Sequence, residues 1–124
     1  MVCSGCHDPH GTQADAQLIR PTVNETCLTC HAEKRGPFLW NHPPVLENCL
    51  TCHAAHGSIN DWLLTVKPPR LCQQCHSEPD HPSLPHNSLH ESFYAPNRFT
   101  FNRGCADCHQ VHGSNSPSGG TLLR

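Results

Sequence analysis

The chain has 124 residues, the length of one domain, and 35% of them are hydrophobic with the ten cysteines included. Four Phe, two Trp and one Tyr are a small stock for a packed core, and small domains without such a core usually depend on disulfides or metals. A formal net charge of −2 without a basic cluster argues against nucleic acid as a partner, and no run is long and apolar enough to cross a bilayer.

Along the chain, all ten cysteines fall into five copies of Cys-x-x-Cys-His, at residues 3–7, 27–31, 49–53, 72–76 and 105–109. This run is the attachment signature of c-type haem, in which two thiols bond to one porphyrin and the histidine binds its iron. The sequence therefore predicts five covalently attached haem c groups. The attachment cysteines are Cys3, Cys6, Cys27, Cys30, Cys49, Cys52, Cys72, Cys75, Cys105 and Cys108, and the proximal iron ligands are His7, His31, His53, His76 and His109.

Other uses of paired cysteines explain this pattern less well. A disulfide framework is compatible with an even number of cysteines, but it gives no reason for a histidine after every second one. Zinc ribbons need such pairs two at a time, and five is an odd number. A thioredoxin-like redox motif is expected once, within a βαβ unit, whereas this motif recurs.

The twelve histidines outnumber the proximal ligands, and seven remain: His10, His42, His56, His81, His86, His90 and His112. The single methionine, Met1, can serve one iron at most, so histidine is the expected second axial ligand. Bis-histidine ligation lowers the reduction potential relative to histidine–methionine ligation, which predicts low-potential, six-coordinate haems. Because seven imidazoles exceed five irons, some of the seven are surface residues.

Three motifs continue as Cys-His-x-x-His-Gly, which places His10, His56 and His112 three residues after a proximal histidine. Residues three apart lie on the same side of a helical turn, so these imidazoles cannot bind the opposite face of the iron held by their neighbour. We therefore expect each of them to bind the haem of a different motif, which brings the haems close together. The glycine that follows lets the backbone turn away sharply.

The other spare histidines lie between motifs. His42 and His81 stand in proline-bounded segments that suit a distal ligand. His86 and His90 lie in the long interval before the last motif, and we interpret them as surface residues.

Prolines spread along the chain and Gly- and Ser-rich runs predict a mostly irregular fold with short α-helices and little or no β-sheet. Each motif is expected to form one or two helical turns, and the best helix candidates are 24–34, capped by Asn24, and 47–54. We expect a single pentahaem cytochrome domain over 1–124, with a core made of haem and an extended tail at 114–124. The apoprotein is then expected to be unfolded.

Three runs resemble the periplasmic decahaem c-type cytochromes of the MtrA and DmsE type: 23–38 (Val-Asn-Glu-Thr-Cys-Leu-Thr-Cys-His-Ala-Glu-Lys-Arg-Gly-Pro-Phe), 68–76 and 104–115. The likeness covers nearly the whole chain and corresponds to the carboxy-terminal five-haem half of that family, and similarity to NrfB-type pentahaem cytochromes is weaker. It implies His10, His42, His56, His81 and His112 as distal ligands. The family has a His-His-Pro segment before the motif that matches residues 3–7, and the chain starts after that point. The distal ligand of the first haem is thus open between His86, His90, a neighbouring subunit and none.

The resemblance implies electron transfer between the periplasm and the cell exterior by an exported bacterial protein, in the periplasm or at the outer membrane. It implies redox partners such as other cytochromes, a quinol-oxidising donor and an outer-membrane porin–cytochrome complex. Haem attachment follows export, so a signal peptide is expected outside this chain. Because spare histidines exceed irons, we expect an electron carrier and not an enzyme. The alternatives are a multihaem reductase of the nitrite or sulfite type, which needs one open iron, and a subunit of a conductive cytochrome filament.

Overall fold

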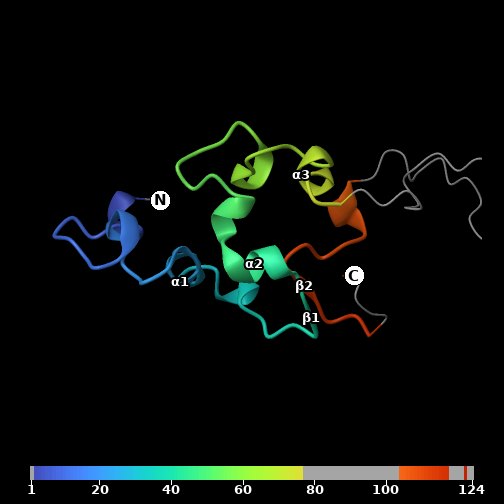
Figure 1. Ribbon diagram of the computed structural model, residues 1–124, viewed down its shortest axis with the longest axis horizontal. Coiled ribbons are helices and arrows are strands. Elements are labelled where there is room, and N and C mark those ends of the chain that lie inside the picture. The colour runs from blue at the N-terminus through green and yellow to red at the C-terminus, as the bar shows by residue number, and fades with distance from the viewer. Residues whose placement is uncertain (1, 77–103, 118–121, 123–124) are drawn as a thin grey trace, which may run out of the picture.

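A computed structural model describes residues 2–76, 104–117 and 122 (Figure 1). Within them the backbone is mostly irregular, which confirms the predicted fold class. The longer elements are three short helices and one pair of two-residue strands, joined by single 3-10 turns. In chain order they are α1 (Val23–Leu28), β1 (Trp40–Asn41), α2 (Pro43–Glu47), α3 (Arg70–Gln73) and β2 (Gly113–Ser114).

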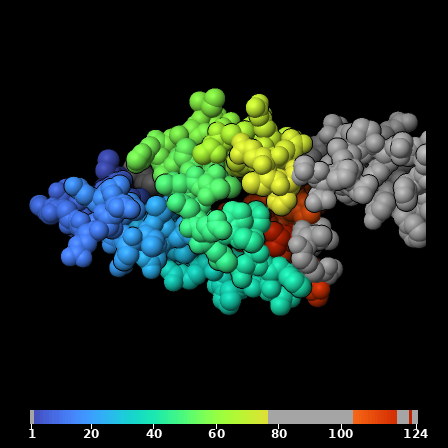
Figure 2. Space-filling view, viewed as in Figure 1, coloured from blue at the N-terminus to red at the C-terminus, as the bar shows by residue number. Residues whose placement is uncertain are grey.

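Among the described residues no apolar side chain is buried. The polar side chains that are buried there belong to Thr26 and Ser114. Large apolar side chains remain at the surface, including Ile59, which is fully exposed, and Trp62, which is 77% exposed. Figure 2 shows these residues as a narrow, elongated body with the amino-terminal segment at one end. Burial of apolar side chains, the usual main source of stability, is therefore missing from this part of the chain. None of its helices is long and apolar enough to cross a membrane.

Helix α1 begins with an N-cap at Thr22. The Thr22 hydroxyl oxygen accepts a hydrogen bond from the Glu25 amide at 3.1 Å and donates one to the Glu25 carboxylate at 3.2 Å. The predicted cap at Asn24 is wrong, because Asn24 lies inside the first turn and its side chain points to a neighbouring segment. The predicted helices 24–34 and 47–54 are shorter than expected, since each breaks into a short α-helix or α-helical end and a 3-10 turn.

Asn24 instead joins α1 to the segment that carries the third motif. Its amide nitrogen donates to the carbonyl oxygens of Val45 and Leu46 at 3.0 and 3.1 Å. Its side-chain oxygen accepts from the Cys49 amide at 2.8 Å. Three hydrogen bonds from one side chain thus hold the second and third motifs next to each other.

The strands β1 and β2 pair in antiparallel fashion, with Trp40 opposite Ser114 and Asn41 opposite Gly113. The Trp40 indole nitrogen adds a hydrogen bond to the Ser116 carbonyl at 3.0 Å. This pairing brings the segment between the second and third motifs to the end of the chain that follows the fifth. Ser114 to residue 117 belong to the predicted tail, and the extended tail as a whole stays a prediction.

Gly113 has a φ of +150°, which side-chain-bearing residues rarely adopt. A β-carbon here would also stand 2.6 Å from Cγ of Phe38. Only glycine therefore fits at the point where the chain after the fifth motif meets β1.

Candidate haem-binding sites

All five Cys-x-x-Cys-His motifs adopt the same single helical turn, as predicted. In each one the histidine amide donates to the carbonyl oxygen of the first cysteine, at 2.9 to 3.0 Å. This is the i to i−4 bond of an α-helix, so the first cysteine and the histidine project from the same side of the turn. Two thiols and one imidazole thus converge at every motif, as attachment to one porphyrin requires.

The chain folds back on itself in the same way after the first and the third motif. We call residues 7–18 the first return loop and residues 53–64 the second return loop. An isolated β-bridge closes each loop, between His7 and Leu18 and between His53 and Leu64. A hydroxyl group braces each from within, because Thr12 donates to the Leu18 carbonyl at 2.9 Å and its counterpart Ser58 donates to the Leu64 carbonyl.

Each return loop reverses direction through two consecutive residues in the left-handed region. They are Ala16 and Gln17, with φ of 53° and 54°, and Trp62 and Leu63, with φ of 55° and 56°. The reversal points the carbonyl oxygens of Ala16 and Trp62 back at the proximal histidines. Nδ1 of His7 donates to Ala16 at 2.7 Å, and Nδ1 of His53 donates to Trp62 at 2.8 Å.

These hydrogen bonds determine which ring nitrogen is free. A carbonyl oxygen only accepts, so Nδ1 carries the proton in both histidines and Nε2 is left as the metal-binding nitrogen. His42 is oriented in the same manner, since its Nδ1 donates to the Val111 carbonyl at 2.8 Å. A hydrogen bond of this kind sets the orientation of a metal-bound imidazole and raises its basicity.

Three pairs of imidazoles face each other at nearly the same separation. The ring centres are 5.9 Å apart for His7 and His56, 6.0 Å for His42 and His76, and 6.2 Å for His53 and His112. A metal–imidazole bond is about 2.0–2.1 Å long and the nitrogen lies roughly 1.1 Å from the ring centre, so two imidazoles on opposite sides of one metal ion have centres about 6.2–6.4 Å apart. The three separations match the space that one iron occupies.

Every facing pair joins a proximal histidine to a histidine from elsewhere in the chain. His56 follows the third motif but faces His7 of the first, and His112 follows the fifth motif but faces His53 of the third. The structure thus brings together the partners that the His-x-x-His argument requires. Burial lowers the pKa of His112, helped by the positive charge of Lys34, which favours the neutral imidazole.

Two candidate ligands, His10 and His31, have no facing histidine in the part of the chain that the structure describes. His31 lies instead 3.7 Å from the Glu33 carboxylate. The sequence left the partner of His7 open, whereas the structure places His56 there. His81, His86 and His90 lie outside the described residues, so the expected pairing of His81 and the surface roles of His86 and His90 stay predictions.

The thiols of successive motifs lie close to each other. Burial raises the pKa of Cys27 to about 11, together with a hydrogen bond to Cys49 and the nearby Cys6. Burial likewise raises the pKa of Cys72 to about 11, with Cys105 hydrogen-bonded to it and Cys52 nearby. The attachment sites therefore follow one another in space in the order of the sequence, and Figure 1 shows the same progression from the N-terminus past α1 and α2 to α3.

The described residues fit haem c on three independent counts. Two thiols and a histidine converge at each motif, three pairs of imidazoles lie about the width of an iron apart, and the described part of the chain buries no apolar side chain. Large, flat, apolar groups bonded to the chain would supply that core. The thiols react on attachment and become thioethers, so their raised pKa values apply only to the chain before attachment.

Sequence reasoning missed the backbone groups that orient the ligands, the carbonyls of Ala16, Trp62 and Val111. A signal was present, because the first and third motifs share the pattern His-Gly-Thr/Ser-x-x-Asp after the motif, at His10 to Asp15 and at His56 to Asp61. Two stretches with the same pattern predict two loops of the same shape.

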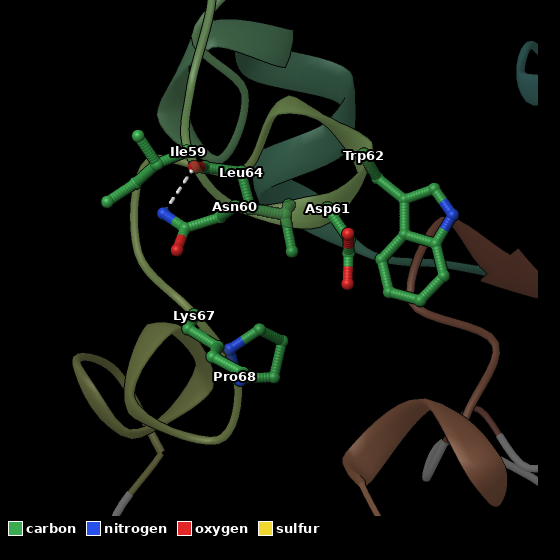
Figure 3. A pocket seen from close by; sticks show the side chains of 7 residues that line it. All are labelled: Ile59, Asn60, Asp61, Trp62, Leu64, Lys67 and Pro68. Atoms are coloured by element: carbon green, nitrogen blue, oxygen red, sulfur yellow. Dashed lines mark hydrogen bonds between the residues drawn. The ribbon is translucent and has the colours of Figure 1, made fainter.

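The second return loop also borders a hollow of about 300 Å³ (Figure 3). The Asn60 side chain stabilises the second return loop by donating a hydrogen bond to the Leu64 carbonyl at 2.9 Å, and the Trp62 side chain projects from the loop. None of the residues that line the hollow is a cysteine or a histidine. Its lining residues are Ile59, Asn60, Asp61, Trp62, Leu64, Lys67 and Pro68.

Comparison with known proteins agrees with this chemistry. The family described as "Doubled CXXCH motif" matches residues 1–36 and 42–81, which is more than half of the chain and includes four of the five motifs. The multiheme cytochrome MtrA of Shewanella baltica (strain OS185) is 54% identical over 127 aligned residues. That alignment covers 100% of this chain and 38% of the relative, so the chain spans well under half of the relative's length. The chain belongs to the doubled CXXCH motif family and is a haem-c-binding, MtrA-type multihaem cytochrome.

Proposed function

We propose that this chain carries electrons through five covalently bound c-type haems and catalyses no bond chemistry of its own. The observation that carries the proposal is the set of three facing imidazole pairs, His7 with His56, His42 with His76, and His53 with His112. Each pair would hold one iron between two imidazole nitrogens, which would leave no open position there for a substrate. When bound, haem supplies one-electron redox chemistry, with a potential set by its axial ligands and surroundings.

The chain's own residues hold the imidazoles in place. Carbonyl oxygens of Ala16, Trp62 and Val111 accept from one histidine of each pair, so the ring cannot rotate without losing that bond. Two imidazole ligands at each iron support a low potential relative to histidine–methionine ligation. A rigid ligand set also suits electron transfer, because the site has little to rearrange when its charge changes.

The order of the sites supports a linear path. Cys27 interacts with both Cys6 and Cys49, and Cys72 interacts with both Cys52 and Cys105. Each haem would then neighbour the haems of the motifs before and after it. Imidazoles that cross from one motif to another would add further connections, since the second return loop would hold one haem through His53 and reach the iron of another through His56.

The cellular setting that we propose is the bacterial periplasm, with association at the outer membrane and exchange with the cell exterior. This setting is the one that the resemblance to MtrA-type cytochromes implies. The proposed partners are other redox proteins, such as cytochromes that deliver or accept electrons.

Carbon monoxide binding to the reduced, haem-loaded chain tests the ligand pairs. His56→Ala should open the haem at His7 and leave the haem at His53 closed, and His112→Ala should open the haem at His53. Each variant should bind one more carbon monoxide per chain than the unmodified protein. If either variant binds no more, or opens the haem of its own motif, the assigned pairs are wrong.

A further inference from the structure

The two return loops are attached to their motifs by the same backbone hydrogen bonds. After the first loop the Ile19 amide donates to the Cys6 carbonyl at 2.9 Å. After the second loop the Thr65 amide donates to the Cys52 carbonyl, also at 2.9 Å. The loops therefore begin and end at matching points, and they can be compared position by position.

One matching position has a polar side chain in the second loop and none in the first. Ala14 and Asn60 have nearly the same backbone conformation, with φ and ψ of −79° and 151° and of −95° and 147°. The Ala14 amide donates to the Thr12 hydroxyl at 3.2 Å, and the Asn60 amide donates to the Ser58 hydroxyl at 3.0 Å. An asparagine side chain can donate hydrogen bonds of its own, whereas that of alanine cannot.

The Asn60 side chain uses this capacity at the closing end of the second loop. Its nitrogen donates to the Leu64 carbonyl at 2.9 Å (Figure 3), and the Ser58 hydroxyl donates to the same oxygen. Both hydrogen bonds are partly buried, where water competes less for the donors. In the first loop the matching carbonyl accepts from the exposed Thr12 hydroxyl.

Leu64 lies next to the group that orients a proximal histidine. It pairs with His53 in the β-bridge, and the Trp62 carbonyl accepts from Nδ1 of His53 at 2.8 Å. Trp62 and Leu63 have positive φ, a strained conformation that persists only where its surroundings hold it. Hydrogen bonds that fix Leu64 thus keep the Trp62 carbonyl directed at His53.

We propose that Asn60 is a positioning residue for the haem of the third motif. By fixing Leu64, it holds the Trp62 carbonyl on Nδ1 of His53 more firmly than the first loop holds the corresponding group. A firmer hydrogen bond from Nδ1 makes the imidazole a more basic ligand, which favours oxidised iron and lowers the reduction potential of that haem. The inference rests on the proposed function, because it needs haem bound at His53.

Asn60→Ala gives the second loop the residue that the first loop has, so the variant should still fold and load with haem. Proton exchange at Nδ1 of His53 is measured by NMR in the reduced, haem-loaded protein with isotope-labelled histidine. It should become about 2- to 12-fold faster, the factor that corresponds to one hydrogen bond. The reduction potential of the third haem, followed by NMR through a redox titration, should rise. Exchange at Nδ1 of His7 should not change.

Ala14→Asn makes the reciprocal change in the first loop. Exchange at Nδ1 of His7 should slow by a similar factor, and the potential of the first haem should fall. Ala14→Leu is the matched control, because leucine is similar in size to asparagine but has no amide, and it should have neither effect. If Asn60→Ala does not load with haem, the comparison of the two Ala14 variants tests the proposal.

The proposal is overturned if Asn60→Ala leaves either the exchange at His53 or the potential of the third haem unchanged. It is also overturned if exchange becomes faster at His53 and His7 alike, since that indicates a general loss of stability, or if Ala14→Asn behaves as Ala14→Leu does. Failure of the proposed function looks different, because His53 of the unmodified protein would then give no signal of an iron-bound imidazole.

Discussion

Gly113→Ala tests whether the contact between β1 and the end of the chain holds a distal histidine in place. Gly113 follows His112 directly, and a β-carbon there would stand 2.6 Å from Cγ of Phe38. Gly57 provides a matched control, because it follows His56 in the same way, has a φ of +134° and has nothing within 4 Å of the position that a β-carbon would take. Both substitutions introduce the same kind of backbone strain, but only Gly113→Ala also introduces a collision with Phe38.

The expected energies follow from this difference. A side chain in a sparsely populated backbone region costs of order 1–3 kcal/mol, and both variants bear this cost. Overpacking against a fixed neighbour adds about 1–3 kcal/mol, and only Gly113→Ala bears it. Gly113→Ala should therefore be less stable than Gly57→Ala by about 1–3 kcal/mol, which corresponds to roughly a 5- to 150-fold difference in the unfolding equilibrium.

Guanidinium unfolding of the haem-loaded variants, followed by far-ultraviolet circular dichroism, measures the difference in stability. Carbon monoxide binding provides a second measurement, because relief of the collision would move His112 away from His53. Gly113→Ala should then bind carbon monoxide at the third motif, and Gly57→Ala should not. Equal free energies of unfolding for the two variants, with His112 still a ligand in both, would refute the idea that this contact positions the histidine.

Three further substitutions test separate features of the structure. Asn24→Ala removes three hydrogen bonds between α1 and the segment of the third motif. At about 0.5–1.5 kcal/mol each, their loss should lower the free energy of unfolding by about 1.5–4.5 kcal/mol. A loss below about 1 kcal/mol in denaturant titration would contradict that linking role. Thr22→Ala removes the cap of α1 and should cost about 1 kcal/mol in the same titration, with Thr22→Ser as the control that retains the hydroxyl. Cys30→Ala should leave one thioether at the second motif. The pyridine haemochrome spectrum should then change at one haem in five, while the mass of the protein still includes every haem. An unchanged spectrum would argue against attachment at that cysteine.

Much of the chemistry was predictable because it depends on residues that lie within one helical turn of each other in the sequence. The turn of each motif depends on a hydrogen bond between residues four apart, and all five copies form it. The mostly irregular backbone also followed from the prolines and turn residues. The cap of α1 was assigned to the wrong residue because Thr22 and Asn24 are both good capping residues, and only the long-range bonds of Asn24 show that its side chain is used elsewhere.

The sequence by itself predicted the attachment cysteines, the proximal histidines and the rule that a histidine three residues later cannot serve the same iron, since these predictions depend only on the motif and on the geometry of one helical turn. Which motif each spare imidazole faces was decided by the tertiary structure. His56 reaches His7, His112 reaches His53 and His42 reaches His76 because hydrogen bonds and strand pairing between distant segments place them there. Contacts of that kind leave no regular spacing in the chain, because a loop of any length can bring the two partners together.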